Sequence, residues 1–245
     1  EQYIIDYLFN LPDAPCDPNV LQVASEAALK SIVSQHKLLV EQASGIYSFS
    51  DLRFQQYFVA REIAEGSNPH ESDLALKNLV SHLNETRWRE VFLLVVGMLR
   101  NADYLLNLIK EKTDTILAAD EELQYFLIWL NQKSISADDA AYKPSNFRAF
   151  YLEFILGIDS EDPFEDNSID CDRINPIGAD SSFELVNFPF TVEQKAILKQ
   201  YYDANRLLID CLAEARYVSR AKREEIEQTL LVPTQVDNKP NSAIA

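Results

Sequence analysis

The sequence contains little glycine and little positive charge, and both shortages exclude classes of protein. Only five glycines occur among 245 residues, and the pattern G-x-x-x-x-G-K-[ST] is absent. This chain therefore cannot cradle a nucleotide triphosphate by itself. The 22 basic residues face 39 acidic ones, which gives a formal net charge of −17. Because such a surface repels phosphate groups, we expect neither broad nucleic-acid binding nor membrane binding.

Cysteine and long apolar runs are scarce as well. Cys16, Cys171 and Cys211 are far apart and odd in number, so we expect no disulfide framework and a reducing, cytoplasmic location. The apolar run that begins at Val91 is too short to span a bilayer, and no signal peptide is recognisable. The chain begins at Glu1 without Met and inside a helical pattern, so we expect it to be cut from a longer polypeptide.

The abundant residues favour helix, and residues 1–66 add a small β-hairpin. Apolar residues at helical spacing predict a helix over Tyr3–Leu11 and another from Val20, with Asn19 as its cap. Two short β-like runs follow, joined by the tight connection "ASG", and an amphipathic helix comes next. Two helices followed by a hairpin are the parts of a winged helix, so we predict a winged-helix-like domain over residues 1–66.

The rest of the chain shows helix after helix with short breaks. We predict a C-terminal helical domain over residues 67–231, with helix pairs stacked as a HEAT-like bundle, and a polar tail over 232–245. Residues 158–190 are acidic and rich in turn formers, which predicts a loop. Thr191 and Ser219 are the expected caps of the last two helices. The predicted fold class is therefore mainly α with one small hairpin.

The stretch "YSFSDLRFQQYFVAREI" resembles the end of the winged-helix domain in NACHT-type STAND NTPases. The pattern there is similar to F-x-F-x-H-x-T-F-Q-E-Y-F-x-A, and the matching residues here are Phe49, Ser50, Phe54, Gln55, Tyr57, Phe58 and Ala60. The helical segments that follow are similar to the C-terminal helical region of bacterial, in particular cyanobacterial, NACHT proteins. The resemblance runs over most of residues 1–231.

This resemblance implies a regulatory region without chemistry of its own. The NTPase core, which would bind ATP or ADP, would lie upstream in the same polypeptide and be the main partner. The helical domain would sense an unknown protein or ligand trigger or restrain self-assembly, with a use in anti-phage defence. The candidate contacts between domains are Phe49, Asp51, Arg53, Phe54, Gln55, Tyr57 and Phe58.

Asp51 departs from the family pattern. Relatives commonly carry His at this position, where it can reach the phosphate of the bound nucleotide. A carboxylate would be repelled by phosphate, whereas Asp51 suits the N-cap of the following helix. Arg53 and Gln56 also replace the usual Thr and Glu. These departures leave a second interpretation open, a protein–protein interaction scaffold that has lost the nucleotide-dependent switch.

A basic run near the C-terminus is the remaining candidate contact. Arg216, Arg220, Lys222 and Arg223 lie close together in an acidic chain. They predict either a contact with an acidic partner or an RNA end, or a solvated helix start with mixed charges.

No set of residues predicts catalysis or a metal site. His36, His70 and His82 are scattered, and His82 suits packing or capping. A hydrolase would need a cleft that gathers His82 or His36 with acids. The acids of "SEDPFEDNSIDCD" lack the order of a calcium loop. Cys211 and most aromatic residues fall on apolar helix faces, where we expect burial; several exposed together would mark a partner groove.

Overall fold

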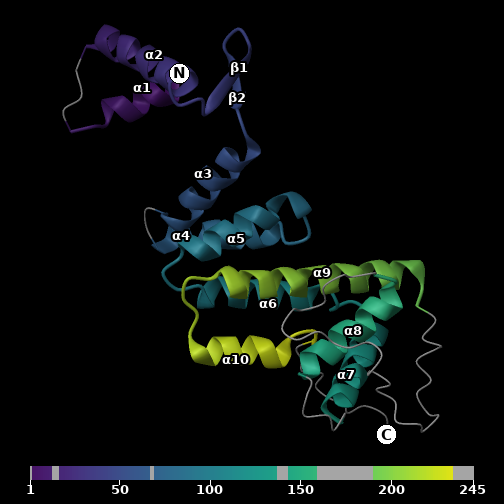
Figure 1. Cartoon of the computed structure of the whole chain (residues 1–245). Helices are drawn as coiled ribbons and strands as arrows, with labels where there is room; N and C mark the ends of the chain where they lie inside the picture. The colour runs from purple at the N-terminus through teal and green to yellow at the C-terminus, as the bar shows by residue number, and fades with distance from the viewer. Residues whose placement is uncertain (1, 13–16, 67–68, 137–142, 159–189, 234–245) are drawn as a thin grey trace, which may run out of the picture. The chain divides into compact units, whose positions relative to one another are not determined.

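The chain divides into two compact units, Glu1–Glu62 and Ile63–Ala245, and each is described by itself (Figure 1). The computed structural model describes residues 2–12, 17–66, 69–136, 143–158 and 190–233.

The first unit contains two helices, a hairpin and most of a third helix. The elements are α1 (Gln2–Phe9), α2 (Pro18–Ser34), β1 (Leu39–Ala43), β2 (Ile46–Phe49) and α3 (Leu52–Ala64). The expected cap of α2 was wrong by two residues. Asp17 is the N-cap, and its carboxylate accepts a hydrogen bond from the Asn19 amide at 2.9 Å. Pro18 takes the first helical position, where its missing N–H costs nothing.

The two strands form the predicted antiparallel hairpin. Leu39 is opposite Phe49, and the register shifts between Glu41 and Ala43. The turn needs a left-handed residue, and Gly45 supplies it with φ of +74°. The Gly45 amide donates a hydrogen bond to the Glu41 carboxylate at 2.9 Å, which fixes the turn on the strand.

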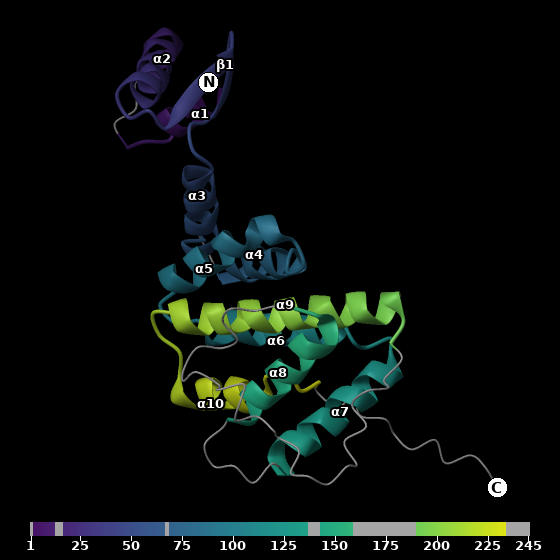
Figure 2. The same ribbon diagram turned by 45° about the vertical axis from the view of Figure 1, so that its right-hand side comes forward.

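The second unit is a helical bundle organised around its longest helix. Its elements are α4 (Pro69–Ser81), the short 3-10 helix η1 (Thr86–Trp88), α5 (Arg89–Met98), α6 (Asp103–Thr115), α7 (Glu121–Ser136), α8 (Pro144–Leu156), α9 (Val192–Glu214) and α10 (Arg220–Thr229). Helix α9 packs against α5, α6 and α8, while α4 packs against α6 and α7 against α8. In both views α9 lies alongside α6, and α10 lies below α6 (Figures 1 and 2).

Packing therefore joins α9 to helices that come much earlier in the chain. A core cluster contains residues from α7, α8, α9 and the segment that follows α10, among them Leu127, Leu152, Tyr201, Leu230 and Leu231. Such close-packed apolar burial is the main favourable term in the stability of the bundle.

The structure confirms a mainly α chain with one small hairpin and a helical bundle. It also confirms both expected caps. Thr191 and Gln194 form a reciprocal capping box, and the Ser219 hydroxyl accepts from the Lys222 amide at 3.3 Å. The winged-helix-like and HEAT-like assignments and the domain limits at 66 and 231 stay predictions.

Two expected segments fall largely outside the described residues. The acidic loop over 158–190 includes 159–189, and the tail over 232–245 includes 234–245, neither of which the structure describes. Among the helices that the structure does describe, none has both the length and the apolar character required to cross a bilayer.

Candidate functional site

The junction between β2 and α3 is held by short-range hydrogen bonds. The Ser50 amide donates to the Leu38 carbonyl at 2.9 Å, and its hydroxyl donates to the Lys37 carbonyl at 2.6 Å. Asp51 follows directly, and its carboxylate accepts a hydrogen bond from the Arg53 amide at 2.9 Å. This is the geometry of a helix N-cap, so the local role expected for Asp51 is confirmed.

The side chain of Arg53 engages the same carboxylate. Its Nη2 lies 2.6 Å from Asp51 Oδ2, and its Nε lies 3.1 Å from both carboxylate oxygens. These hydrogen bonds lower the pKa of Asp51 to about 2. Asp51 thus stays ionised at neutral pH, with its oxygens occupied by a neighbour two residues away.

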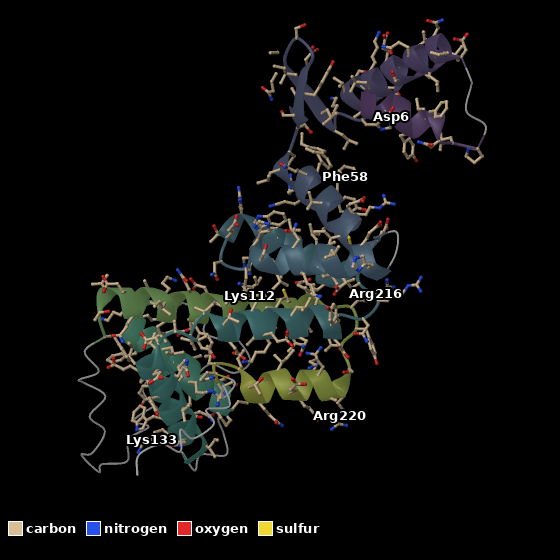
Figure 3. All side chains as sticks on the ribbon, turned by 180° about the vertical axis from the view of Figure 1, so that it is seen from behind. Asp6, Phe58, Lys112, Lys133, Arg216 and Arg220 are labelled. Atoms are coloured by element: carbon tan, nitrogen blue, oxygen red, sulfur yellow. The ribbon has the colours of Figure 1, made fainter. Side chains whose placement is uncertain are left out.

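Aromatic side chains next to this junction form an exposed surface. The rings of Phe49 and Phe58 stack with centroids 6.1 Å apart, and Tyr57 meets Phe58 edge-on at 5.5 Å. Phe54, Tyr57 and Phe58 keep 38–43% of their surface accessible. Figure 3 shows Phe58 among the side chains of α3. We call Phe49, Phe54, Tyr57 and Phe58 the α3 aromatic surface.

The expectation that burial explains most of the aromatic residues needs a correction at four of them. Phe92 and Tyr151 are buried as expected, whereas Phe154 is 71% exposed, and Phe54, Tyr57 and Phe58 share the α3 aromatic surface. Of the seven candidate contacts between domains, Asp51 is partly buried and the other six are exposed: Phe49, Arg53, Phe54, Gln55, Tyr57 and Phe58.

The basic run is partly neutralised by its own helix. Arg216 follows α9 and Arg220 begins α10 (Figure 3). Arg220 pairs with Glu224, and Lys222 pairs with Glu225, each at 2.6 Å. Arg223 donates a hydrogen bond to the Leu212 carbonyl at 3.5 Å. These pairs reduce the positive charge offered to a partner, and contact with an acidic partner stays a prediction.

His82 is a packing histidine, as expected. Its ring stacks on Trp88 with centroids 4.3 Å apart, and its Nδ1 lies 2.6 Å from a Glu85 carboxylate oxygen. Across the residues that the structure describes, no three His, Cys, Asp or Glu side chains gather in a way that could hold a metal ion. Cys211 is fully buried on α9, as expected, and burial raises the pKa of its thiol.

A groove of about 400 Å³ lies between α9 and the segment that joins α4 to α5. Leu83, Ala204 and Leu207 supply apolar surface, and Arg89 crosses it to pair with Asp210 at 2.8 Å. Neither His36 nor His82 lines this groove. Its lining residues thus supply no histidine base for a nucleophile.

Residues 228–232, which we call the strap, are held by a buried polar cluster. This cluster was not predicted from the sequence. Arg148 of α8 is 1% exposed. Its Nε donates to the Leu230 carbonyl at 2.9 Å, and its Nη2 donates to the Gln228 carbonyl at 3.4 Å. Its Nη1 donates to the side-chain oxygens of Asn131 and Ser134 at 3.0 and 3.1 Å. Burial lowers the pKa of Arg148 to about 10.

Two further helices hold the strap. Asn205 of α9 is fully buried and accepts a hydrogen bond from the Leu231 amide at 3.1 Å. Lys110 of α6 donates to the Val232 carbonyl at 3.1 Å and pairs with Asp114. Lys110, Arg148 and Asn205 therefore bond backbone groups at the last turn of α10 and in the segment that follows it. We call these three residues the clamp.

A sequence signal for the clamp existed, although it was weak. Arg148 lies between Phe147 and Tyr151 in a helix that is otherwise rich in aromatic and aliphatic residues. A charge on an apolar face indicates a buried hydrogen-bonding role. The sequence gives no indication that its partners would be backbone carbonyls near residue 230.

Residues 182–233 match the family model described as NACHT C-terminal Helical domain 2. The matched segment is about a fifth of the chain and includes α9, α10 and the strap. No curated protein matches this chain, and no solved structure does. Two clamp residues, Lys110 and Arg148, come from outside the matched segment, so helices α6 and α8 complete its packing. Residues 182–233 are thus similar to a helical domain found at the C-terminal side of NACHT proteins.

Proposed function

We propose that this chain is a non-catalytic regulatory region of a NACHT-type signalling NTPase. It couples the nucleotide state of an upstream NTPase domain to the sensing of a protein or ligand, or to self-assembly. The observation that carries the proposal is the match of residues 182–233 to NACHT C-terminal helical domain 2. Such a domain implies an NTPase domain in the parent protein, where ATP or ADP would bind.

The α3 aromatic surface supports a contact with that NTPase domain. Phe49, Tyr57 and Phe58 present adjacent rings to solvent on the first unit, and Phe54 is exposed on the same helix as Tyr57 and Phe58. Groups of exposed aromatic side chains are characteristic of protein contacts, since each buries a large apolar area at low conformational cost. The surface adjoins Asp51, the position that the family resemblance places near the nucleotide.

The unit that carries this surface has the element order of a winged helix. Two helices, the β1–β2 hairpin and α3 follow one another in the chain. In our proposal this unit transmits the nucleotide state, and the helical domain responds by changing its orientation. A bacterial, cytoplasmic role in anti-phage defence is the biological setting that the family resemblance favours.

A second function, an interaction scaffold without the nucleotide switch, is favoured by the Asp51–Arg53 pair. The carboxylate of Asp51 is negative and already accepts hydrogen bonds from three N–H groups of Arg53. A side chain in this state does not donate to a phosphate, as a histidine would.

The test uses the full-length protein. We expect purified protein to retain ADP through gel filtration, measured by chromatography of the released nucleotide. Tyr57→Ser with Phe58→Ser should speed ADP release, because the contact that transmits the nucleotide state is weakened. Phe154→Ser, which removes an exposed aromatic ring from the second unit, serves as the matched control and should leave release unchanged.

Asp51→His separates the two functions. If the position still faces the nucleotide, the histidine should slow ADP release relative to the unaltered protein. Unchanged release together with unchanged partner assembly favours the scaffold. A full-length protein that binds neither ATP nor ADP would overturn the proposed coupling.

A further inference from the structure

Helix α10 is attached to the bundle mainly by polar contacts, at its two ends and at Lys222 and Arg223. All ten of its residues are described, and of these Ile226 alone is buried. Ahead of the helix, the Ala102 amide donates to the Tyr217 carbonyl at 3.1 Å, and the Ser219 amide donates to Asp103 at 2.8 Å. Along the helix, Lys222 donates to the Asn107 side chain at 3.2 Å and Arg223 donates to the Leu212 carbonyl at 3.5 Å. The body of α10 contributes little apolar burial, so its position depends on these polar contacts.

The far end of α10 is held by the clamp. Leu230 and Leu231 are buried in the core, and the clamp residues bond the backbone around them. Leu231 has φ of +58°, a left-handed conformation that disfavours a residue with a side chain. The docked strap thus stores backbone strain that is released when the strap leaves its site.

Burying the charge of Arg148 reduces the net stability that its hydrogen bonds give to the docked strap. Among the described residues, the atoms that accept hydrogen bonds from Arg148 are all neutral oxygens. A buried cation without a carboxylate partner bears a desolvation cost that neutral oxygens offset only in part. Opening the strap would return this guanidinium to water. The clamp therefore specifies where the strap docks and adds less stability than an apolar contact of the same area would.

We propose that α10 and the strap form a latch, residues 220–232, that opens as one unit while α5, α6, α8 and α9 remain folded. Opening uncovers the clamp residues Lys110, Arg148 and Asn205 together. The inference is independent of the proposed function, because it concerns the cooperativity of this chain and requires no nucleotide. It gives the helical domain two discrete states, docked and open, which a binding partner could discriminate.

Hydrogen exchange of the intact chain, followed by mass spectrometry at low urea concentrations, tests the latch. If the latch opens as a separate cooperative unit, its open state should be at least about 10-fold more populated than the open state of α9. The amides of α10 should then exchange correspondingly faster than those of α9. Equal exchange in α9 and α10, with the same urea dependence, would show one cooperative unit and overturn the proposal without any variant.

Arg148→Met adds a test of the clamp. It removes the donors to Leu230 and Gln228, so exchange in 220–232 should rise by about 10-fold or more, since hydrogen bonds from a charged group are lost. Exchange in α5 and α9 should stay within about 2-fold. Arg220→Ala removes an exposed ion pair from α10 and is the matched control, with little change expected. A uniform rise across the bundle in Arg148→Met would contradict the latch.

Discussion

Arg148 on α8 donates its Nε hydrogen to the backbone carbonyl of Leu230 at 2.9 Å, across a separation of 82 residues. The same guanidinium donates to the Gln228 carbonyl. One side chain thus bonds both the last turn of α10 and the segment that follows it. The segment that matches the NACHT helical family thus depends on a helix outside the match. A piece limited to residues 182–233 would lack both this donor and Lys110.

Adjacent tyrosines on α9 give a matched pair of predictions. The Tyr202 hydroxyl donates to the buried Glu153 carboxylate, whereas the Tyr201 hydroxyl has no hydrogen-bond partner in the described part of the chain. Tyr202→Phe should lower the free energy of unfolding by about 1–3 kcal/mol, because Glu153 loses a donor. Tyr201→Phe should cost less than about 1 kcal/mol or stabilise. Urea denaturation followed by circular dichroism measures both, and equal losses would contradict the assignment.

Phe92 and Phe154 test where the core lies. Phe92 on α5 is fully buried, and Phe154 on α8 is 71% exposed. Phe92→Ala should lower the free energy of unfolding by about 3–5 kcal/mol, since it leaves a cavity. Phe154→Ala should change it by about 0.5 kcal/mol or less. Chemical denaturation of both variants provides the comparison. A large loss in Phe154→Ala would show that this ring is covered in solution.

The capping box at the start of α9 predicts a smaller effect. The Thr191 hydroxyl accepts from the Gln194 amide at 3.1 Å, and the Gln194 side chain accepts from the Thr191 amide at 3.0 Å. Thr191→Ala should cost about 0.5–2 kcal/mol in unfolding free energy, while Thr191→Ser should retain most of the stability. Thermal unfolding distinguishes the two variants. A serine variant as unstable as the alanine one would rule out the cap as the cause.

Asp51 should titrate far below an ordinary aspartate. Its folded pKa is lowered to about 2 by the hydrogen bonds from Arg53. Because the folded value lies below the unfolded value, any stabilisation from this carboxylate is present at neutral pH and is lost as the pH falls toward about 2. Carbon-detected NMR titration of the side chain measures the midpoint, and Arg53→Ala should move it upward. A midpoint near 4 in the unaltered chain would refute the pairing.

Cys211 should be inert in the folded chain. It is fully buried, and burial raises the pKa of its thiol, so the reactive thiolate is absent at neutral pH. Iodoacetamide followed by peptide mass spectrometry should leave Cys211 unmodified in buffer and modify it in denaturant. Rapid modification under native conditions would show that α9 opens readily or that its packing differs.

Local patterns in the sequence predicted most elements correctly. The helical spacing of apolar residues located the helices, and the turn chemistry of "ASG" located the hairpin. Thr191 and Ser219 were recognisable caps, because a cap acts on amides only a few residues away. The cap of α2 was missed because Asp17 and Asn19 both suit the position, and Pro18 decides between them.

Exposure was harder to predict than helix formation. An aromatic residue at helical spacing indicates an apolar stripe, yet Phe154 shares its helix with buried Tyr151 and points to solvent. Periodicity shows which residues share a face, but it does not show whether another element covers that face.

The sequence by itself determined the helical character, the hairpin, the caps and the absence of a phosphate-binding loop, because each depends on residues that are close together in the chain. Only the tertiary structure decided that Lys110, Arg148 and Asn205 would meet at the strap. The physical reason is that a buried polar side chain must find a partner, and here the partners are backbone atoms of a segment 26–122 residues away.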